Sequence, residues 1–126
     1  MDAPVERLKR RRDFLGVAAS QRKWVAPGMI VQFRPYQDGE KAPHPAKKPS
    51  VRVGFTVSRR VGNAVTRNRV RRRLRAVADR VLAHHAAPGA DYVIVGRAGS
   101  IERPFAALVG DLETALKRLG AWRARP

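Results

Sequence analysis

The 126-residue sequence contains no cysteine and only ten acidic residues. Without cysteine there can be no disulfide, thiolate metal site or cysteine nucleophile, so a cytoplasmic location is the default expectation. No apolar run approaches the roughly 20 residues that span a bilayer, and the charged N-terminal segment lacks the apolar stretch of a secretory signal. Apolar residues still make up 44% of the chain. We therefore expect one domain with a real core and no membrane partner.

Positive charge is what the sequence has in excess. Lysine and arginine number 27 and the formal net charge is +17. The segment 59–75 (RRVGNAVTRNRVRRRLR) holds eight arginines and no acid. Such crowding destabilises a fold through self-repulsion, and a phosphate backbone would offset it. A membrane-surface helix would place bulky apolar residues opposite its cations, whereas this segment offers only valine, leucine and alanine. Nucleic-acid binding, to RNA before DNA, is the first hypothesis.

The apolar spacing predicts an α+β fold in the order helix, strands, helix, strand, helix. We expect a basic, mobile arm over 1–12, one domain over 13–120 with a proline-rich surface loop over 37–50, and a basic tail over 121–126. Asp13 could cap the first helix. The expected helices are 13–21, 64–84 and 104–119, and the expected strands are 24–25, 29–34, 51–58 and 91–97.

Two elements show a clear apolar face. Strand 51–58 alternates, with one apolar face (Val51, Val53, Phe55, Val57) and one polar face (Arg52, Gly54, Thr56, Ser58). The last helix carries one apolar stripe, which should pack on the sheet: Phe105, Leu108, Leu112, Leu116 and Leu119. Strand 91–97 is a continuous apolar run and is expected to be central in its sheet.

The helix 64–84 combines a narrow apolar arc with a wide basic surface. At about 100° per residue, Val70, Leu74, Val77 and Val81 share the arc that must face the sheet. Basic and amide side chains cover the rest of the circumference: Arg67, Asn68, Arg69, Arg71, Arg72, Arg73, Arg75 and Arg80. A solvated surface helix would normally carry acids as i,i+4 partners, and none occurs before Asp79. A DNA recognition helix would follow a short first helix, which is missing here.

The stretch 51–74 closely resembles the signature region of the bacterial ribonuclease P protein family. The shared parts are the basic pair Arg59-Arg60, the turn Gly62-Asn63-Ala64-Val65 and the helix start Arg67-Asn68-Arg69. The resemblance implies an α-β-β-β-α-β-α sandwich like the second domain of ribosomal protein S5, with a left-handed βαβ crossover. It also implies a ribozyme cofactor that binds the catalytic RNA subunit and the 5′ leader of precursor tRNA and aids removal of that leader. Mg²⁺ then acts through the RNA subunit, and the protein alone binds no cofactor.

The resemblance also assigns roles to residues. Those expected to contact the RNA subunit are Arg59, Arg60, Arg67, Asn68, Arg69, Arg71, Arg72 and Arg75. Leader binding must tolerate many sequences, which favours stacking over base-edge readout. The residues expected in the leader cleft are Phe14, Phe33, Arg52, Thr56 and Ser58, with core packing an equal alternative for Phe33. Ala18 replaces a second aromatic of that cleft, and Trp24 and Trp122 have no role in this hypothesis.

No catalytic or metal site is expected on the protein itself. The three histidines lie in the proline loop and at a helix end, and no two acids form a pair suited to general acid–base or two-metal chemistry. No obligate protein partner is expected. The alternatives that stay open are a ribosomal-type structural RNA-binding protein and a basic protein that coats DNA or a membrane surface.

Overall fold

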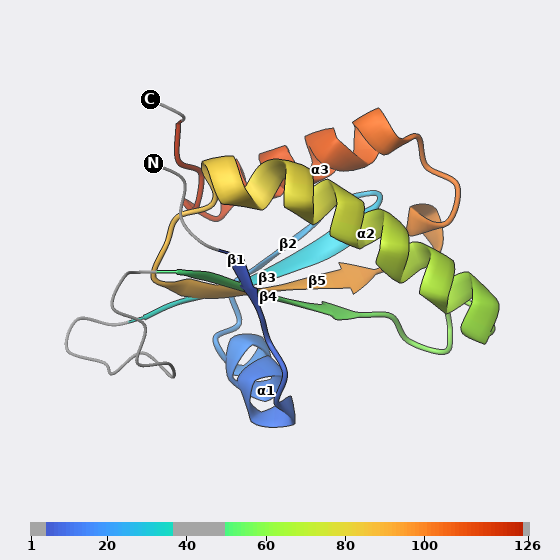
Figure 1. The fold of residues 1–126 in the computed structure, drawn as a ribbon, viewed down its shortest axis with the longest axis horizontal. Coiled ribbons are helices and arrows are strands. Elements are labelled where there is room, and N and C mark those ends of the chain that lie inside the picture. Colours follow the sequence, from blue (N-terminus) through green and yellow to red (C-terminus); the bar gives the residue numbers. More distant parts are fainter. Residues whose placement is uncertain (1–4, 37–49, 125–126) are drawn as a thin grey trace.

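The computed structural model describes residues 5–36 and 50–124. It consists of a five-stranded sheet with α1 on one face and α2 and α3 on the other (Figure 1). The elements are β1 (Val5–Arg7), α1 (Arg11–Ala19), β2 (Lys23–Val25), β3 (Met29–Pro35), β4 (Val51–Thr56), α2 (Ala64–His85), β5 (Ala90–Gly96), the short 3₁₀ helix η1 (Ala98–Ser100) and α3 (Phe105–Arg118). The proline-rich loop predicted over 37–50 lies outside the described residues, apart from Ser50.

The sheet is mixed, with strand order β1-β4-β5-β3-β2. β4 pairs in parallel with both β1 and β5, whereas β3 pairs antiparallel with β5 and β2. The central position of β5 confirms the prediction from its continuous apolar run. β4 and β5 are parallel neighbours joined through α2, as the expected crossover requires. The left-handed sense of that crossover and the likeness to protein S5 stay predictions.

The N-terminal segment corrects the prediction of a mobile arm for residues 5–12, whereas residues 1–4 of that prediction lie outside the described residues. Val5–Arg7 forms an edge strand on β4, and the Leu8 amide extends the pairing by donating to the Val53 carbonyl at 2.9 Å. The first helix already begins at Arg11, so Asp13 lies in its first turn and does not cap it. A strand of three residues is too short to show the alternation on which the sequence analysis relied.

The tail over 121–124 also belongs to the fold. Ala121 is fully buried, and Trp122 forms an antiparallel bridge with Ala86 at the end of α2. The prediction of a separate basic tail is therefore wrong for these residues.

The main core lies between the sheet and the two long helices. The predicted arc of α2 is buried there, with Val70, Leu74 and Val77 at 0% exposure. The predicted stripe of α3 is buried from Leu108 onward, but Phe105 is 39% exposed because it is the first residue of the helix. On the other side of the sheet, a much smaller core joins α1 to it: Leu8, Val17 and Val93, with Phe14 and Val95 partly buried beside them.

Candidate nucleic-acid interface

The turn that precedes α2 fixes where the helix starts. A Cβ atom on Gly62 would lie 2.9 Å from the Thr66 Cγ2 atom, so only glycine allows this close approach. Asn63 is the N-cap residue, and its Oδ1 accepts a hydrogen bond from the Thr66 amide at 2.9 Å. The Gly-Asn turn therefore places Arg67, Asn68 and Arg69 in the first two turns of α2.

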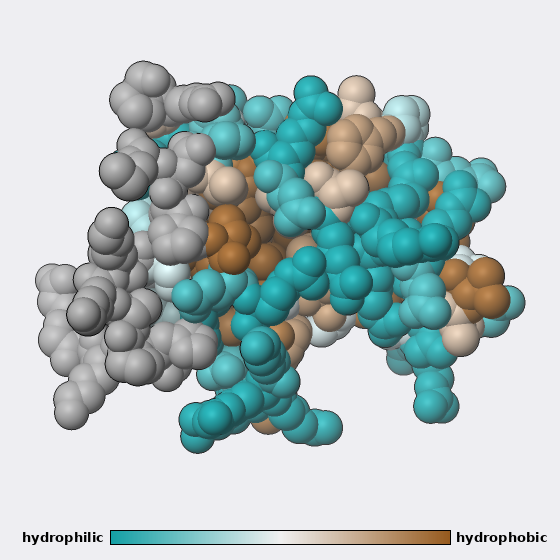
Figure 2. All heavy atoms as spheres, viewed as in Figure 1, coloured by the Kyte–Doolittle hydropathy of each residue, from teal (hydrophilic) through white to brown (hydrophobic). Residues whose placement is uncertain are grey.

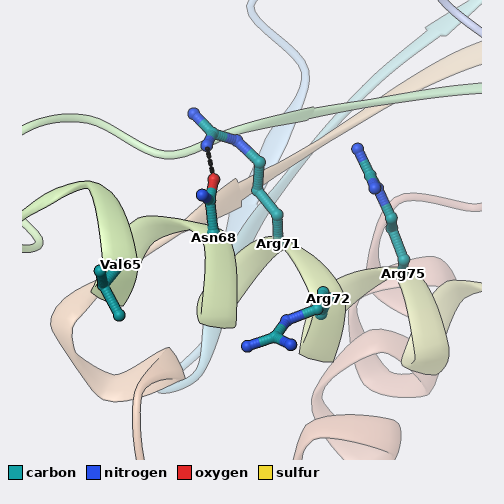
Figure 3. Close-up of a pocket in the computed structure, with 5 residues that line it drawn as sticks. All are labelled: Val65, Asn68, Arg71, Arg72 and Arg75. Atoms are coloured by element: carbon teal, nitrogen blue, oxygen red, sulfur yellow. Dashed lines mark hydrogen bonds between the residues drawn. The ribbon is translucent and has the colours of Figure 1, made fainter.

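Most of the predicted RNA-contacting side chains of α2 are free to meet a ligand. Asn68, Arg69, Arg72 and Arg75 are exposed, and Arg67 and Arg71 are partly buried. The Asn68 Oδ1 accepts a hydrogen bond from Arg71 at 3.0 Å, which orients that guanidinium. A shallow groove of about 480 Å³ lies along this surface, lined by Val65, Asn68, Arg71, Arg72 and Arg75 (Figure 3).

We call the residues Arg67, Asn68, Arg69, Arg71, Arg72 and Arg75 the arginine face of α2. Figure 2 shows hydrophilic side chains along this helix, across the side of the molecule seen in Figure 1. Arg59 and Arg60 are exposed in the connection that leads from β4 to α2. The structure therefore brings the predicted RNA-contacting residues together at one end of the molecule.

Arg73 is an exception to the predicted basic circumference. Its guanidinium turns inward and donates to the carbonyl of Ile101 at 3.3 Å and to that of Arg103. Arg73 therefore ties α2 to the connection between η1 and α3. The sequence analysis missed this because the partners are backbone carbonyls, which leave no signal in side-chain types.

Within residues 5–36 and 50–124, no ion pair neutralises the charge of the arginine face. Three acids of the described part pair with arginines away from this face: Asp13 and Asp91 with Arg52, and Asp111 with Arg103. A surface of this kind attracts a polyanion, since each phosphate neutralised by a cation releases condensed counterions.

On the other side of the sheet, Phe14 forms the junction between α1 and β4. A Cβ atom on Gly54 would lie 2.3 Å from the Phe14 Cε1 atom, so the ring packs directly on the glycine backbone. The ring is only partly buried, as is Thr56 at the end of β4. Ser58 is exposed just beyond, and Ala18 is exposed on α1. Phe14, Thr56 and Ser58 are thus accessible to a ligand on this side.

The prediction that Arg52 contacts the leader is wrong. Arg52 is only 2% exposed, and its Nε and NH2 groups donate to the two Asp91 oxygens at 2.8 and 2.9 Å. Asp13 of α1 lies 3.3 Å from the same guanidinium, and the Tyr36 hydroxyl donates to Asp91. Burial works against the charged form, but the hydrogen bond and charge of Asp91 raise the pKa of Arg52 overall. The guanidinium is needed here because the sheet register places Arg52 beside the buried Asp91.

The prediction that Phe33 lines the cleft is also wrong, and the core alternative is correct. Phe33 is 4% exposed and belongs to the core on the α2–α3 side, opposite α1. Its ring centroid lies 5.2 Å from that of Tyr92, and the Arg22 guanidinium lies 4.8 Å above the ring. The alternation of β3 directs Phe33 to this side together with Met29 and Val31.

Two searches of the described residues bear on other functions. In residues 5–36 and 50–124, no group of three histidine, cysteine or acidic side chains could hold a metal ion. Over the same part of the chain, no helix is both long enough and apolar enough to cross a membrane.

The fold is that of a known class, the bacterial ribonuclease P proteins. The solved protein from Thermotoga maritima superimposes with a TM-score of 0.69 at 28% identity, covering 90% of this chain and 96% of that one. The Staphylococcus aureus protein has the same fold, with a TM-score of 0.71, 20% identity, and coverage of 93% and 97%.

Sequence comparisons define the family. The family model described as ribonuclease P matches residues 3–120. The ribonuclease P protein component of Paramagnetospirillum magneticum is 51% identical over 121 residues, covering 96% of this chain and 87% of the relative. That of Gluconacetobacter diazotrophicus is 45% identical over 114 residues, covering 90% of each chain. The chain belongs to the ribonuclease P protein family and is thus a protein subunit of the endoribonuclease that processes the 5′ end of tRNA.

Proposed function

We propose that the chain binds the catalytic RNA subunit of ribonuclease P through the arginine face of α2 and the 5′ leader of precursor tRNA on the α1 side of the sheet. In this way it aids endonucleolytic removal of the leader. The observation that carries the proposal is the arginine face itself, which is exposed, preceded by a fixed helix start and without an acidic partner among the described residues.

The RNA contact works through charge. Arg69, Arg72 and Arg75 neutralise phosphates where the RNA backbone is crowded, and guanidinium groups suit bidentate phosphate contact. Arg59 and Arg60 add to the same site from the preceding connection. Asn68 holds Arg71 in one orientation, which lowers the conformational entropy lost on binding. The hydrolysis belongs to the RNA subunit and its Mg²⁺, and the protein lowers the Mg²⁺ concentration that the complex needs.

The leader contact depends on stacking. Phe14 offers a partly exposed ring held against Gly54, and Thr56 and Ser58 offer hydroxyls at the end of β4. Stacking on an aromatic ring is tolerant of base identity and contributes about 1–3 kcal/mol per base. With Ala18 in place of a second aromatic and Phe33 in the core, Phe14 is the main stacking surface of this cleft.

The test of the overall function is cleavage of a leader-bearing precursor tRNA by a bacterial ribonuclease P RNA at low Mg²⁺, with and without the chain. We expect strong stimulation that depends on leader length. Tight RNA binding without stimulation would favour the structural RNA-binding alternative instead.

The test of the arginine face is the double variant Arg67→Ala with Arg69→Ala. Assembly with the RNA subunit should weaken at least tenfold, or about 1.4 kcal/mol, while the unfolding temperature changes little. Normal assembly of this variant would remove α2 from the RNA interface.

The test of the leader site is Phe14→Ala. Precursor tRNA should lose about tenfold in affinity for the complex, whereas mature tRNA, which has no leader, should bind as before. Equal losses for the two RNAs would exclude Phe14 from the leader site.

A further inference from the structure

The two tryptophans, which the proposed function leaves unused, both lie beneath cations from the last turn of α3. The Lys117 Nζ atom is 4.6 Å from the Trp122 ring centroid, and the Arg118 guanidinium carbon is 5.4 Å from that of Trp24. Nearby, Arg22 lies over Phe33 and donates to the Leu119 carbonyl at 2.8 Å. We call Arg22, Lys117, Arg118 and Arg123 the distal basic patch.

The aromatic supports of this patch are themselves held in place. Trp122 stacks on His85 of α2 with ring centroids 4.1 Å apart and planes 8° apart. The Arg123 amide donates to the His85 carbonyl at 2.6 Å, which fastens the end of the chain to the end of α2. A cation over a ring keeps its charge while losing conformational freedom, so a partner that binds it pays a smaller entropic cost.

The helix dipole does not account for the whole patch. Cations in a last helical turn stabilise the negative end of the helix, which explains Lys117 and Arg118 alone. Arg22 precedes β2 and Arg123 follows α3, so three separate segments bring positive charge to one place. All four side chains are exposed, and none forms an ion pair within residues 5–36 and 50–124.

The position of the patch indicates which RNA would meet it. α2 and α3 share one side of the sheet and their C-terminal ends lie together, away from the start of α2, whereas α1 lies on the opposite side (Figure 1). His85 follows Arg67 along the same helix by about 27 Å, at about 1.5 Å per residue. An RNA seated on the arginine face would therefore reach the patch by extending along α2, while the proposed leader site is on the other side of the sheet.

We propose that the distal basic patch is a second contact for the phosphate backbone of the RNA subunit, separate from the arginine face. The inference rests on the proposed function and adds a second anchoring point at the far end of α2. Because the contact is to phosphates, it depends on charge and salt, and it carries no base specificity.

The test compares two matched pairs of neutral substitutions. Lys117→Gln with Arg118→Gln removes two charges from the patch. Lys9→Gln with Arg10→Gln removes the same two residue types from an exposed site at the start of α1. Binding of each variant of the full chain to ribonuclease P RNA is measured over a range of salt concentrations, first without precursor tRNA and then with it.

We expect the patch pair to weaken RNA-subunit binding about tenfold and to reduce the slope of log K against log salt by about 1.4–1.8, or roughly 0.7–0.9 per lost phosphate contact. The α1 pair should change affinity by less than about threefold. The swapped variant Lys117→Arg with Arg118→Lys keeps both charges and should bind as the unaltered chain does.

Three outcomes would overturn the patch while leaving the proposed function intact. They are equal losses for the two matched pairs, no loss for the patch pair, and a loss that appears only when precursor tRNA is added. Failure of the unaltered chain to bind the RNA subunit would instead overturn the proposed function, and the patch with it.

Discussion

The two sides of the sheet are stabilised in different ways. On the α2–α3 side, a continuous apolar core includes fully buried residues from both long helices, such as Leu74 and Leu112. On the α1 side, the buried apolar cluster of the described residues consists of Leu8, Val17 and Val93, and a charged network of Asp13, Arg52 and Asp91 joins the helix to the sheet. The first side depends on apolar burial and the second on charge pairing.

This difference explains how α2 can carry so many arginines and remain stable. Like charges along one helix repel each other, so that helix needs stability from another source. The buried arc from Val70 to Val81 supplies it through apolar burial, at about 25 cal/mol per Å² removed from water. Helix α1 has nine residues and one fully buried apolar side chain, so its attachment is the weaker of the two.

The largest expected effect comes from breaking the charged network. Arg52→Met leaves Asp91 buried without its cation, and we expect a loss of about 3–5 kcal/mol in the free energy of unfolding, measured by denaturant titration. Combining it with Asp91→Leu removes the stranded charge and should recover part of that loss. A cost below about 1 kcal/mol for Arg52→Met would show that the network does not hold α1 to the sheet.

The next effect compares the two apolar clusters. Leu74→Ala should cost about 2–5 kcal/mol and destabilise the whole domain, because it opens a cavity in the main core. Val17→Ala should cost roughly half as much and act mainly on α1. Hydrogen exchange is the measurement: Val17→Ala should speed exchange of α1 amides while α2 amides keep their protection. A uniform increase in both helices would show that the two sides open as one unit.

A smaller effect is the pH dependence of folding stability that comes from two tyrosines, Tyr36 and Tyr92. Burial, together with the hydrogen bond to Asp91, raises the pKa of Tyr36, and burial raises the pKa of Tyr92. Above pH 10 the unfolded chain loses these protons while the folded chain keeps them, so the folded state binds more protons and stability falls as pH rises. Below pH 10 neither tyrosine contributes a pH dependence.

The expected slope is up to about 1.4 kcal/mol per pH unit for each tyrosine between pH 10 and 12. Tyr36→Phe and Tyr92→Phe should each remove one tyrosine's share of the slope, which pH-dependent denaturant titration would measure. An unchanged slope in either variant would mean that the pKa of that tyrosine is the same in the folded and the unfolded chain.

The sequence predicted the elements that carry a long periodic signal. The arc of α2, the central position of β5 and the Gly62-Asn63 helix start are all confirmed, since each depends on local spacing or local turn chemistry. The arginine face followed from the same helical spacing.

Long-range partners could not be predicted. The polar face of β4 was expected to meet a ligand, but Arg52 meets Asp91 of β5 and Asp13 of α1, which are distant in the sequence. The sequence predicted stacking roles for both Phe33 and Phe14. In the structure the two rings lie on opposite faces of the sheet. The short strand β1 and the attached tail were missed because their stability comes from pairing and not from their own pattern.

The smallest expected change in stability distinguishes two adjacent arginines of α2. Arg72 is exposed and lines the groove, whereas Arg73 donates to the Ile101 and Arg103 carbonyls. Arg73→Gln should cost about 1 kcal/mol of folding stability, because it removes hydrogen bonds from a charged donor, and should leave the salt dependence of RNA binding unchanged. Arg72→Gln should change stability by less than about 0.5 kcal/mol but reduce the salt slope by about 0.7–0.9. If instead Arg73→Gln reduced the salt slope of RNA binding, RNA binding would release Arg73 from the η1–α3 connection. Helix α2 would then contact its ligand with its full basic circumference.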